Sequence, residues 1–523
     1  YFWNTEVKVY SCIGVKTSEE LGRYLVATRD LAPGDLVLTE KPLVFGPKAT
    51  ADPEATMPCV GCYRPKYVLK GLNLEVEVYY LGDHDNMTRS ALKLTHLIIL
   101  FIYFIFRHDA LLPLRCLLLQ KTDPAKWKLL VNLQSHMECR TPGTEVYDEA
   151  NEFVVQYLFV HFLNDFKAFD KAQYAKIFPE ASVELVHKIC GIIDTNALEV
   201  RLSEGTELLA LFTNTCTMEH SCIPNTRHSF ALARNDKENL YKITLKVVVP
   251  VLKNNHITTM YSHALWGTQA RRQHLRDTKY FSCKCIRCRD PTELGTYLSA
   301  MKCLGDGQSP CDGIHLPEDP LDDETDWACS QCTVKISNSQ VNMLIAQMGE
   351  EVENVQMMSP TVPLLENTLV RLSMFLHPNH YHLYSIKHSL IQLYGRQPNY
   401  MSQDILDRKI KMCKDLIAVT KVLDPGNARL SLYSAVLQHE LHSALLTKVK
   451  TSNPSGKAKT GKEIKTLLQE AKVAIFEALQ ALKDEMEESS GQKLYPLIKK
   501  SEAEFEEFCK EKQLLQNHHD KIS

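Results

Sequence analysis

The sequence predicts an α+β protein whose strand-rich part is held together by bound zinc and is followed by an all-helical part. Residues 241–250 and 257–261 are rich in Val, Ile, Leu and Thr, which indicates strands. Three cysteines fall within the six residues 283–288, a spacing typical of zinc ligands. From Ser337 onward, apolar residues recur at helical spacing and predict helices.

Overall composition indicates a globular protein of several domains. A chain of 523 residues predicts roughly two to four domains. Hydrophobic residues make up 44% of the chain and the formal net charge is −3, so the overall charge gives no sign of a nucleic-acid surface. The chain starts at Tyr1 instead of Met, so a targeting signal ahead of it stays an open alternative.

The 17 cysteines are compatible with a secreted disulfide scaffold or with a zinc protein in a reducing compartment. Many of them fall in Cys-x-x-Cys or Cys-x-Cys pairs, and no signal peptide is visible. We therefore favour zinc over disulfides, and we expect the protein in the nucleus and/or the cytoplasm.

The cysteine spacing predicts two zinc sites. Cys283, Cys285 and Cys288 need a fourth ligand because structural zinc is tetrahedral, and Cys222 in a His-Ser-Cys run is the natural candidate. The second site joins a closing Cys-x-x-Cys pair to two earlier cysteines, and its ligands are Cys303, Cys311, Cys329 and Cys332. Four thiolates leave no open coordination position, so both zinc ions are expected to be structural.

The N-terminal part is expected to contain short strands. Residues 7–10, 24–27 and 36–39 have strand composition, and Ala-Pro-Gly-Asp at 32–35 predicts a turn. Taken alone, the tripeptide Gly-Arg-Tyr at 22–24 indicates no more than a hairpin.

Residues 97–106 are ten consecutive apolar residues, against about 20 that are needed to cross a bilayer. We favour a buried helix. Two alternatives stay open, namely a membrane anchor and translation of non-coding sequence across residues 67–110. Cys59 and Cys62 form a metal-type pair, but no further ligands follow at a recognised spacing.

The middle of the chain is predicted to be helical at 111–190 and to return to strand at 191–200. The charged run 266–276 lies on a further predicted helix. We expect that run to be a solvated face in preference to a peptide-docking surface, and we expect the acidic residues 318–326 to be a solvated loop.

Turns at 377–379 and 424–426 separate pairs of predicted helices in the C-terminal part, and residues 451–461 are expected to be a flexible loop. The histidines of residues 377–382 could indicate a metal site. A packed turn is favoured because thiol and carboxylate partners are missing nearby.

Several of these motifs resemble one family. His-Ser-Cys-Ile-Pro-Asn at 220–225, Leu-Arg-Asp at 275–277 and the cysteine run at 283–288 resemble the SET and post-SET segments of SMYD lysine methyltransferases. Residues 287–295 and 316–327 are similar to the arthropod SmydA branch in particular. The resemblance implies a SET-domain β-fold with a helical insert, a cysteine-rich zinc-binding post-SET region and an all-α tetratricopeptide-like C-terminal domain. It also implies that the His-Ser-Cys segment threads beneath the later chain to form the cofactor site.

The resemblance also divides the chain. The expected parts are the N-terminal part of the SET domain (1–58), a degenerate or incomplete MYND region (59–110), the helical SET insert (111–190), the core SET domain (191–281), the post-SET zinc-binding region (282–336) and the helical tetratricopeptide-like domain (337–523).

The resemblance implies the residues of an S-adenosyl-L-methionine site. Tyr261 matches a tyrosine that lines the lysine channel, so it is the expected catalytic residue. The matched positions on the cofactor side are Gly22, Arg23, Tyr24, Asn196, Glu219 and His220. For Asn196 a second role, holding a turn, is left open.

Four departures from the family weaken this match. Tyr24 replaces the second glycine of a Gly-x-Gly, and Glu219 replaces an asparagine whose amide both donates and accepts, whereas a carboxylate only accepts. Lys279 stands where many relatives carry a second channel tyrosine, in a segment expected to be extended. The pair Cys59 and Cys62 opens what is a two-zinc MYND finger in the family, without the remaining ligands.

Two functions follow as expectations. The first is an S-adenosyl-L-methionine-dependent protein-lysine N-methyltransferase that acts on histone or non-histone lysines, with a role in transcriptional regulation. The second is a catalytically weak or inactive SET-fold scaffold that recruits protein partners through its helical C-terminal domain. Direct binding to nucleic acid or to a membrane is not expected.

Overall fold

The structure is a computed structural model. It describes residues 7–9, 11–19, 21–48, 108–202, 207–232, 239–358, 360–396, 400–451, 461–485 and 489–511. The apolar run at 97–106 and the pair Cys59 and Cys62 lie outside the described residues, as does nearly all of the expected MYND region. None of the described helices is long and apolar enough to span a membrane.

The N-terminal strands form several small sheets. The strands are β1 (Val7–Val9), β2 (Ile13–Ser18), β3 (Gly22–Ala27), β4 (Leu36–Glu40), β5 (Val44–Pro47), β6 (Leu198–Arg201), β7 (Glu207–Leu211), β8 (Glu219–His220), β9 (Thr226–Phe230), β10 (Ile243–Val247) and β11 (Thr258–Thr259). One sheet has the order β1-β4-β10-β9 and another the order β5-β7-β6. Strands β2 and β3 pair as a hairpin, and β8 pairs with β11 in parallel. The strands predicted at 7–10, 24–27, 36–39, 241–250 and 257–261 are thus confirmed.

Strand β10 illustrates how the sequence positions this core. Ile243, Leu245 and Val247 are buried, while the two residues between them are partly exposed. Successive side chains in a strand point to opposite faces, so one apolar face is formed. Leu245 pairs with Leu38 of β4, and both are fully buried in the core of the sheets. Burying a side chain of this size contributes about 1.5–3 kcal/mol.

A helical segment interrupts the strands between β5 and β6. Its elements are η2 (His108–Ala110), α2 (Leu111–Thr122), α3 (Pro124–Val131), η3 (Met137–Cys139), α4 (Glu145–Ala150), η4 (Asn151–Val155), α5 (Gln156–Leu158), η5 (Phe159–Leu163), α6 (Asn164–Phe169), α7 (Lys171–Ile177) and α8 (Val183–Asn196). Leu117, Phe162 and Ile189 pack in its core. The helical character predicted for this segment is confirmed.

Helix α8 corrects one sequence-based prediction. Residues 191–196 were expected in a strand, but they continue the helix to Asn196, and strand β6 begins only at Leu198. The hydroxyl of Ser182 caps the helix by accepting from the N–H of Leu185 at 3.2 Å. Ile192 and Ile193 are buried on its apolar face, so packing against the neighbouring helices outweighs the strand propensity of these residues.

The cysteine-rich region and the C-terminal helices follow. The 3-10 turn η6 (Thr215–Thr217) precedes β8. The elements after β11 are α9 (Thr268–Lys279), α10 (Ile286–Arg289), β12 (Met301–Lys302), β13 (Ile314–Pro317), β14 (Trp327–Cys329), β15 (Lys335–Ile336), α11 (Asn338–Met357), α12 (Val362–Leu372), α13 (Tyr381–Leu393), α14 (Gln403–Leu423), α15 (Ser431–Lys450), α16 (Gly461–Leu482) and α17 (Ser490–Glu511).

The described C-terminal elements are helices, as predicted. A capping box starts α11, where the side chains of Ser337 and Gln340 each accept from the backbone N–H of the other residue. The turn at His377 packs as predicted: its N–H donates to the carbonyl of Ala300 at 3.0 Å, and His380 is fully buried.

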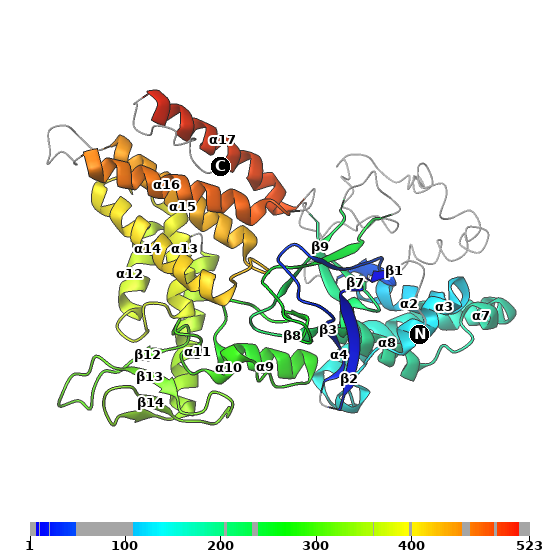
Figure 1. Cartoon of the computed structure of the whole chain (residues 1–523). Coiled ribbons are helices and arrows are strands. Elements are labelled where there is room, and N and C mark those ends of the chain that lie inside the picture. Colours follow the sequence, from blue (N-terminus) through cyan, green and yellow to red (C-terminus); the bar gives the residue numbers. More distant parts are fainter. Residues whose placement is uncertain are drawn as a thin grey trace, which may run out of the picture.

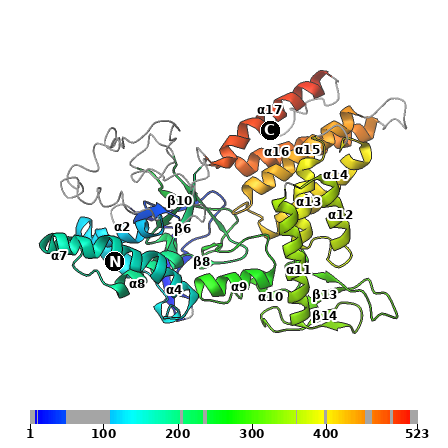
Figure 2. The same cartoon turned by 180° about the vertical axis from the view of Figure 1, so that it is seen from behind.

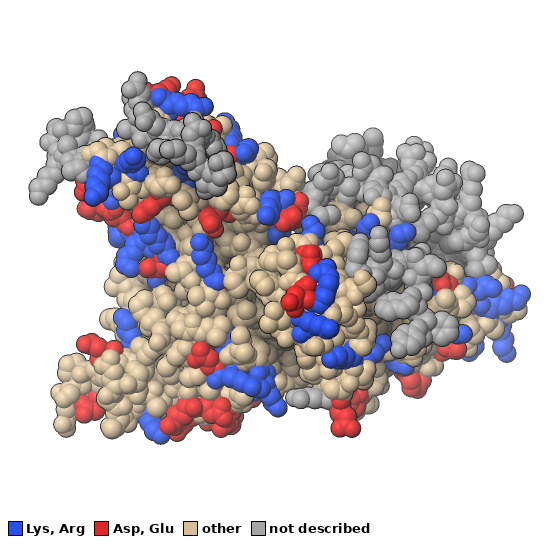
Figure 3. Space-filling view, in the orientation of Figure 1, with Lys and Arg blue, Asp and Glu red and all other residues tan. Residues whose placement is uncertain are grey.

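Figures 1 and 2 show how these parts are arranged. The strands β1–β10 and the helices α2–α8 form one end of the molecule, and the helices α11–α17 form the other. Helices α9 and α10 lie between the two ends. On the face seen in Figure 3, Lys and Arg side chains are interspersed with Asp and Glu among the described residues. This pattern agrees with the low net charge of the chain.

Candidate active site and metal centres

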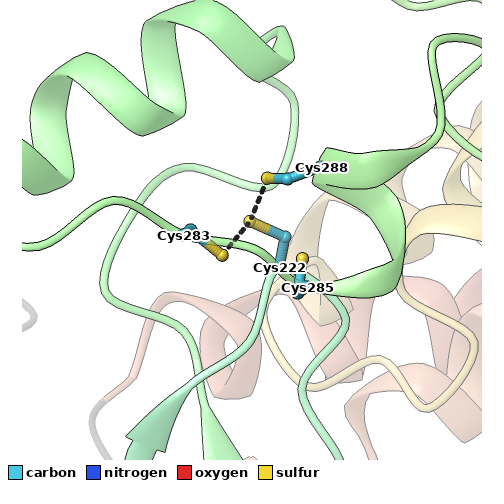
Figure 4. A group of neighbouring side chains, drawn as sticks. All are labelled: Cys222, Cys283, Cys285 and Cys288. Carbon is cyan, nitrogen blue, oxygen red and sulfur yellow. Dashed lines mark hydrogen bonds between the residues drawn. The ribbon is translucent and has the colours of Figure 1, made fainter. Parts of the chain in front are cut away.

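The first group of four cysteines is brought together from distant parts of the chain. Cys222 follows β8, Cys283 and Cys285 lie between α9 and α10, and Cys288 lies on α10. Figure 4 shows the four side chains pointing toward one another. The Sγ of Cys222 lies 4.0 Å from that of Cys283 and 3.6 Å from that of Cys288. Within the group, all sulfur atoms lie within 4.8 Å of one another.

These distances fit zinc. Four sulfur atoms that each bind zinc at about 2.3 Å in a tetrahedron are about 3.8 Å apart, close to the distances observed here. A disulfide would need about 2.05 Å, and the described cysteines are all free thiols. The four thiols are close enough to share protons: hydrogen bonds from the other three lower the pKa of Cys222, whereas those within the group raise the pKa of Cys283 and of Cys288. Four thiolates side by side therefore require the positive charge of a metal.

The second group is built within a small sheet. Strands β12, β13, β14 and β15 pair in that order. The sulfur of Cys303 lies 3.6 Å from that of Cys332, and the sulfur of Cys311 lies 3.7 Å from that of Cys329. These values also fit a tetrahedral zinc. Among the described residues, these are the two groups that could hold a metal, and the histidines of 377–382 are not such a group.

Both predicted ligand sets are therefore brought together in full.

The charged run at 266–276 was predicted less well. Arg271 and Arg272 are buried instead of solvated, while Arg276 is partly exposed. Arg272 donates to the carbonyls of Cys283 and Leu321 at 2.8 and 2.7 Å, so it fixes α9 against the cysteine-rich region.

Arg271 takes part in a buried cluster of charges. Glu293 lies between Arg271 and Arg287, with its Oε2 at 2.7 and 2.8 Å from their guanidinium nitrogens. The three side chains are at most 2% exposed. Burial acts to raise the pKa of Glu293, but the two guanidinium groups outweigh it and hold this pKa at about 2. Residues of the acidic loop 318–326 also form ion pairs: Asp323 pairs with Arg272 and Arg276, and Glu318 pairs with Lys335.

The segments predicted to thread past each other do lie side by side. Glu219 and His220 of β8 pair with Thr258 and Thr259 of β11 in parallel. The N–H of Ser221 donates to the carbonyl of Thr259 at 2.8 Å. These bonds connect the His-Ser-Cys run directly to the segment that carries Tyr261.

His220 lies at the centre of this junction. Its Nδ1 accepts from the backbone N–H of Tyr261 at 2.9 Å, and its Nε2 lies 3.2 Å from the sulfur of Cys222. The hydroxyl of Tyr261 donates to the carbonyl of Met218. Burial raises the pKa of the Tyr261 phenol, so it stays neutral. The rings of His220, Tyr261 and Phe281 contact one another.

Three of the expected cofactor-side residues lie on the hairpin β2–β3. Gly22 has a left-handed φ of +63°, and the position of its missing Cβ has no atom within 4 Å. The ring of Tyr24 stacks on His256, with ring centroids 4.7 Å apart. Glu219 accepts a hydrogen bond from His256 Nδ1. Two of the departures from the family, Tyr24 and Glu219, are thus joined by His256, which sequence reasoning missed.

Asn196 and Lys279 lie together at the end of α8. The amide of Asn196 donates to the carbonyls of Gln134 and Ile192 at 2.7 and 2.8 Å. The ammonium of Lys279 donates to the carbonyls of Asp194 and Thr195, each at 2.8 Å. Lys279 was expected in an extended segment, which is wrong, because it is the last residue of helix α9.

Sequence reasoning also missed Arg271, Arg287 and Glu293 as a unit. The one sequence signal for Arg287 is that it lies directly before Cys288 of the first cysteine group. The acidic partner gave none. Glu293 follows in a loop whose residues Glu293, Leu294 and Tyr297 have positive φ, a geometry that spacing does not reveal.

The fold and the site define a mixed helix-and-strand protein with two four-cysteine centres of the kind that holds zinc. The chain is 27% identical over 341 residues to the SET domain-containing protein SmydA-8, isoform A, of Drosophila melanogaster, and 29% identical over 335 residues to isoform B. These matches cover 61% and 60% of this chain. The chain spans less than two thirds of either relative, 64% in each case.

A plant protein is similar over a longer stretch. The histone-lysine N-methyltransferase ASHR1 of Arabidopsis thaliana is 23% identical over 407 residues, which cover 72% of this chain and 75% of that protein. The crystal structure of the SET domain of LSMT bound to lysine and AdoHcy aligns with 96% of this chain and 89% of that one, at 12% identity and a TM-score of 0.31. No family model matches the chain. The resemblance to the SmydA branch of the SMYD family is confirmed by the named relatives. The expected α+β class is confirmed by the strands and helices of the structure.

Proposed function

We propose that this chain is an S-adenosyl-L-methionine-dependent protein-lysine N-methyltransferase. The observation that carries the proposal is the junction at His220, which joins a zinc ligand to the backbone of Tyr261. Relatives whose names include a SET domain and a histone-lysine methyltransferase support it. The substrate would be a protein lysine, histone or non-histone. The proposal includes a role in transcriptional regulation and a location in the nucleus and/or the cytoplasm.

The residues on the cofactor side fit the polar groups of the methyl donor. S-adenosyl-L-methionine supplies an electrophilic methyl group on a sulfonium when it is bound. The left-handed turn at Gly22 leaves open space for a close approach, and the half-buried carboxylate of Glu219 can accept from an ammonium or a hydroxyl group. Gly22, Arg23, Tyr24 and Glu219, together with the backbone of His220, would hold the cofactor. Asn196 acts at a distance by fixing the end of α8, because its amide nitrogen is engaged by two carbonyls.

The reaction needs a neutral lysine amine in line with the methyl group. A dry environment lowers the pKa of an amine and so favours the neutral form. Tyr261 and Phe281 supply aromatic walls for such a channel, and the neutral Tyr261 phenol is held by its bond to Met218. Alignment of the two reactants is the main catalytic contribution of these residues.

A second candidate is the SET-fold scaffold with weak or no catalysis. The contacts of His256 with Tyr24 and Glu219 favour it, since they join the two substituted positions to each other. Under this alternative, the carboxylate of Glu219 accepts from His256 and does not contact a cofactor. The helical C-terminal domain would then recruit protein partners.

Calorimetric titration of the full chain with S-adenosyl-L-methionine separates the two candidates. The methyltransferase proposal expects saturable binding, transfer of labelled methyl groups to a lysine peptide pool, and tighter binding in Glu219→Asn, which restores the amide of the family. Loss of transfer in Tyr261→Phe with zinc content unchanged would support the channel role. Absence of cofactor binding both in the unmodified chain and in Glu219→Asn would sink the proposal and leave the scaffold.

A further inference from the structure

The thiolate of Cys222 receives hydrogen bonds from two side chains. His220 Nε2 lies 3.2 Å from its sulfur, and Arg271 Nε lies 3.2 Å from the same atom. A second nitrogen of Arg271, Nη2, lies 3.5 Å from the sulfur of Cys288. One guanidinium group therefore spans two ligands of the first zinc site. The fork of five N–H donors makes arginine suited to such a double contact, which lysine cannot reproduce.

Arg271 is held in this position by the rest of the buried cluster. Glu293 accepts from its Nη1 at 2.7 Å, the carbonyl of Trp266 accepts from the same nitrogen, and the hydroxyl of Thr268 accepts from Nη2 at 3.0 Å. Arg287 holds Glu293 from the other side. A buried charge without partners is strongly destabilising. The guanidinium of Arg271 therefore keeps the position in which all of these partners are engaged, which is next to the sulfur atoms.

The cluster also balances charge. A zinc ion with four thiolates carries a net charge of −2, which is costly in a dry interior. The two guanidinium groups and the carboxylate of Glu293 together carry +1. Arg271 places positive charge against the thiolates themselves, so the net charge of the region falls to −1.

The second site is built differently. Its sulfur atoms accept from backbone N–H groups, those of Gly305, Gly313 and Gln331, at 3.3–3.4 Å. Within the described residues, no side-chain nitrogen donates to them. Cys303 is buried, but the other three cysteines are partly exposed, whereas in the first site only Cys285 is partly exposed.

We propose that Arg271 is a positioning residue for the first zinc ion, and that this contact makes the first zinc leave the protein much more slowly than the second. Hydrogen bonds to thiolates stabilise the metal-bound form, and loss of such outer partners typically weakens metal binding by about 10–100-fold. Burial adds to the difference because it keeps an attacking chelator away from the sulfur atoms.

The test measures the release of zinc from the full chain, loaded with two equivalents, to a chromophoric chelator at neutral pH. We expect a fast and a slow phase of equal size. Cys329→Ser should remove the fast phase and Cys222→Ser the slow one. Arg271→Met should speed the slow phase by about 10–100-fold and leave the fast phase unchanged. Arg276→Met is the matched control, because it lies on the same helix but contacts Asp323 and not the cysteines, and it should leave both phases unchanged.

Arg271→Lys keeps the positive charge but loses the double contact, so its slow phase should lie between those of the unmodified chain and Arg271→Met. If Arg271→Met fails to fold, the rate of the slow phase in Arg271→Lys tests the proposal in its place. The proposal is overturned if the slow phase belongs to the second site, if neither Arg271 variant speeds the slow phase, or if both phases speed up together. The last result would indicate general destabilisation.

Discussion

The Nδ1 atom of His220 accepts a hydrogen bond from the backbone N–H of Tyr261 at 2.9 Å. Because Nδ1 is the acceptor, the proton of the neutral ring lies on Nε2, which then donates to the sulfur of Cys222. One ring therefore fixes Cys222 of the first cysteine group on one side and the expected catalytic segment on the other. Its tautomer is set by the protein backbone.

Replacing His220 should loosen both connections. His220→Phe keeps an aromatic ring of similar size but loses two hydrogen bonds, each with a net contribution of about 0.5–1.5 kcal/mol. We expect the backbone N–H of Tyr261 to exchange with deuterium at least about tenfold faster, measured on the peptide that contains it, because about 1.4 kcal/mol corresponds to a factor of ten. His263→Phe is the control, since His263 is an exposed histidine of the same loop. Equal exchange in both variants would contradict the bridging role.

Lys279→Met should weaken the contact between α8 and α9. Its ammonium donates to two carbonyls at the C-terminal end of α8, where a positive charge is also favoured by the helix dipole. We expect a loss of about 1–3 kcal/mol in the free energy of unfolding, measured by urea unfolding with a probe in the N-terminal half. Lys284→Met, at an exposed position five residues on, should have no measurable effect. If both variants unfold at the same urea concentration, the tie at Lys279 contributes nothing to stability.

Metal analysis of the purified chain should give about two equivalents of zinc from the two described sites. Cys222→Ser should lose one equivalent, and Cys329→Ser should lose the other. Any zinc held by Cys59 and Cys62 would add to this number and would remain in the double variant. Fewer than two equivalents in the unmodified chain, or a disulfide that includes Cys283, would refute the assignment.

Stability of the C-terminal helices should fall on acidification through His442. This ring is 1% exposed and its Nδ1 donates to the carbonyl of Ala471 at 2.8 Å, which joins α15 to α16. Burial lowers its pKa from 6.5 to about 4. The unfolded chain therefore binds a proton first as the pH falls. The contribution of neutral His442 is complete above pH 6.5 and is lost progressively down to pH 4.

The loss from this one group amounts to about 3 kcal/mol, since one pKa unit corresponds to about 1.4 kcal/mol. His442→Gln should reduce the dependence of stability on pH between pH 6.5 and pH 4. Hydrogen exchange of the amides of α15 measures this dependence. His161→Gln, at an exposed histidine, should keep the full dependence. A slope that His442→Gln leaves unaltered would show that His442 does not titrate in this range.

Spacing was a sound guide to the metal centres. Every cysteine of the two groups except Cys222 lies fairly close in sequence to at least one other member of its group. Cys222 required a long-range pairing, which followed from the need for four donors. Strand β10 could also be predicted from the sequence, because its alternation of apolar and polar residues is a local property.

Long-range electrostatic partners could not be read from the sequence. A run with Arg271 and Arg272 is usually solvated, since a buried guanidinium is costly. The burial of Arg271 is made possible by Glu293, which lies 22 residues further on. The conformation of the loop that carries Glu293 could not be predicted from the sequence. The same holds for His256, whose contacts with Tyr24 and Glu219 depend on how the hairpin β2–β3 packs against β11.

The pairing of β8 with β11 has a consequence for synthesis of the chain. Cys222 emerges from the ribosome well before its partner Cys283, which lies 61 positions later. Until residue 259 has emerged, the His-Ser-Cys segment lacks its strand partner, and until residues 283–288 have emerged it lacks the other three cysteines. A nascent chain at this stage exposes a free thiol and a strand open to mispairing. The N-terminal half can thus complete its fold only after residue 288 has left the exit tunnel, and zinc supply at that moment becomes part of its folding pathway.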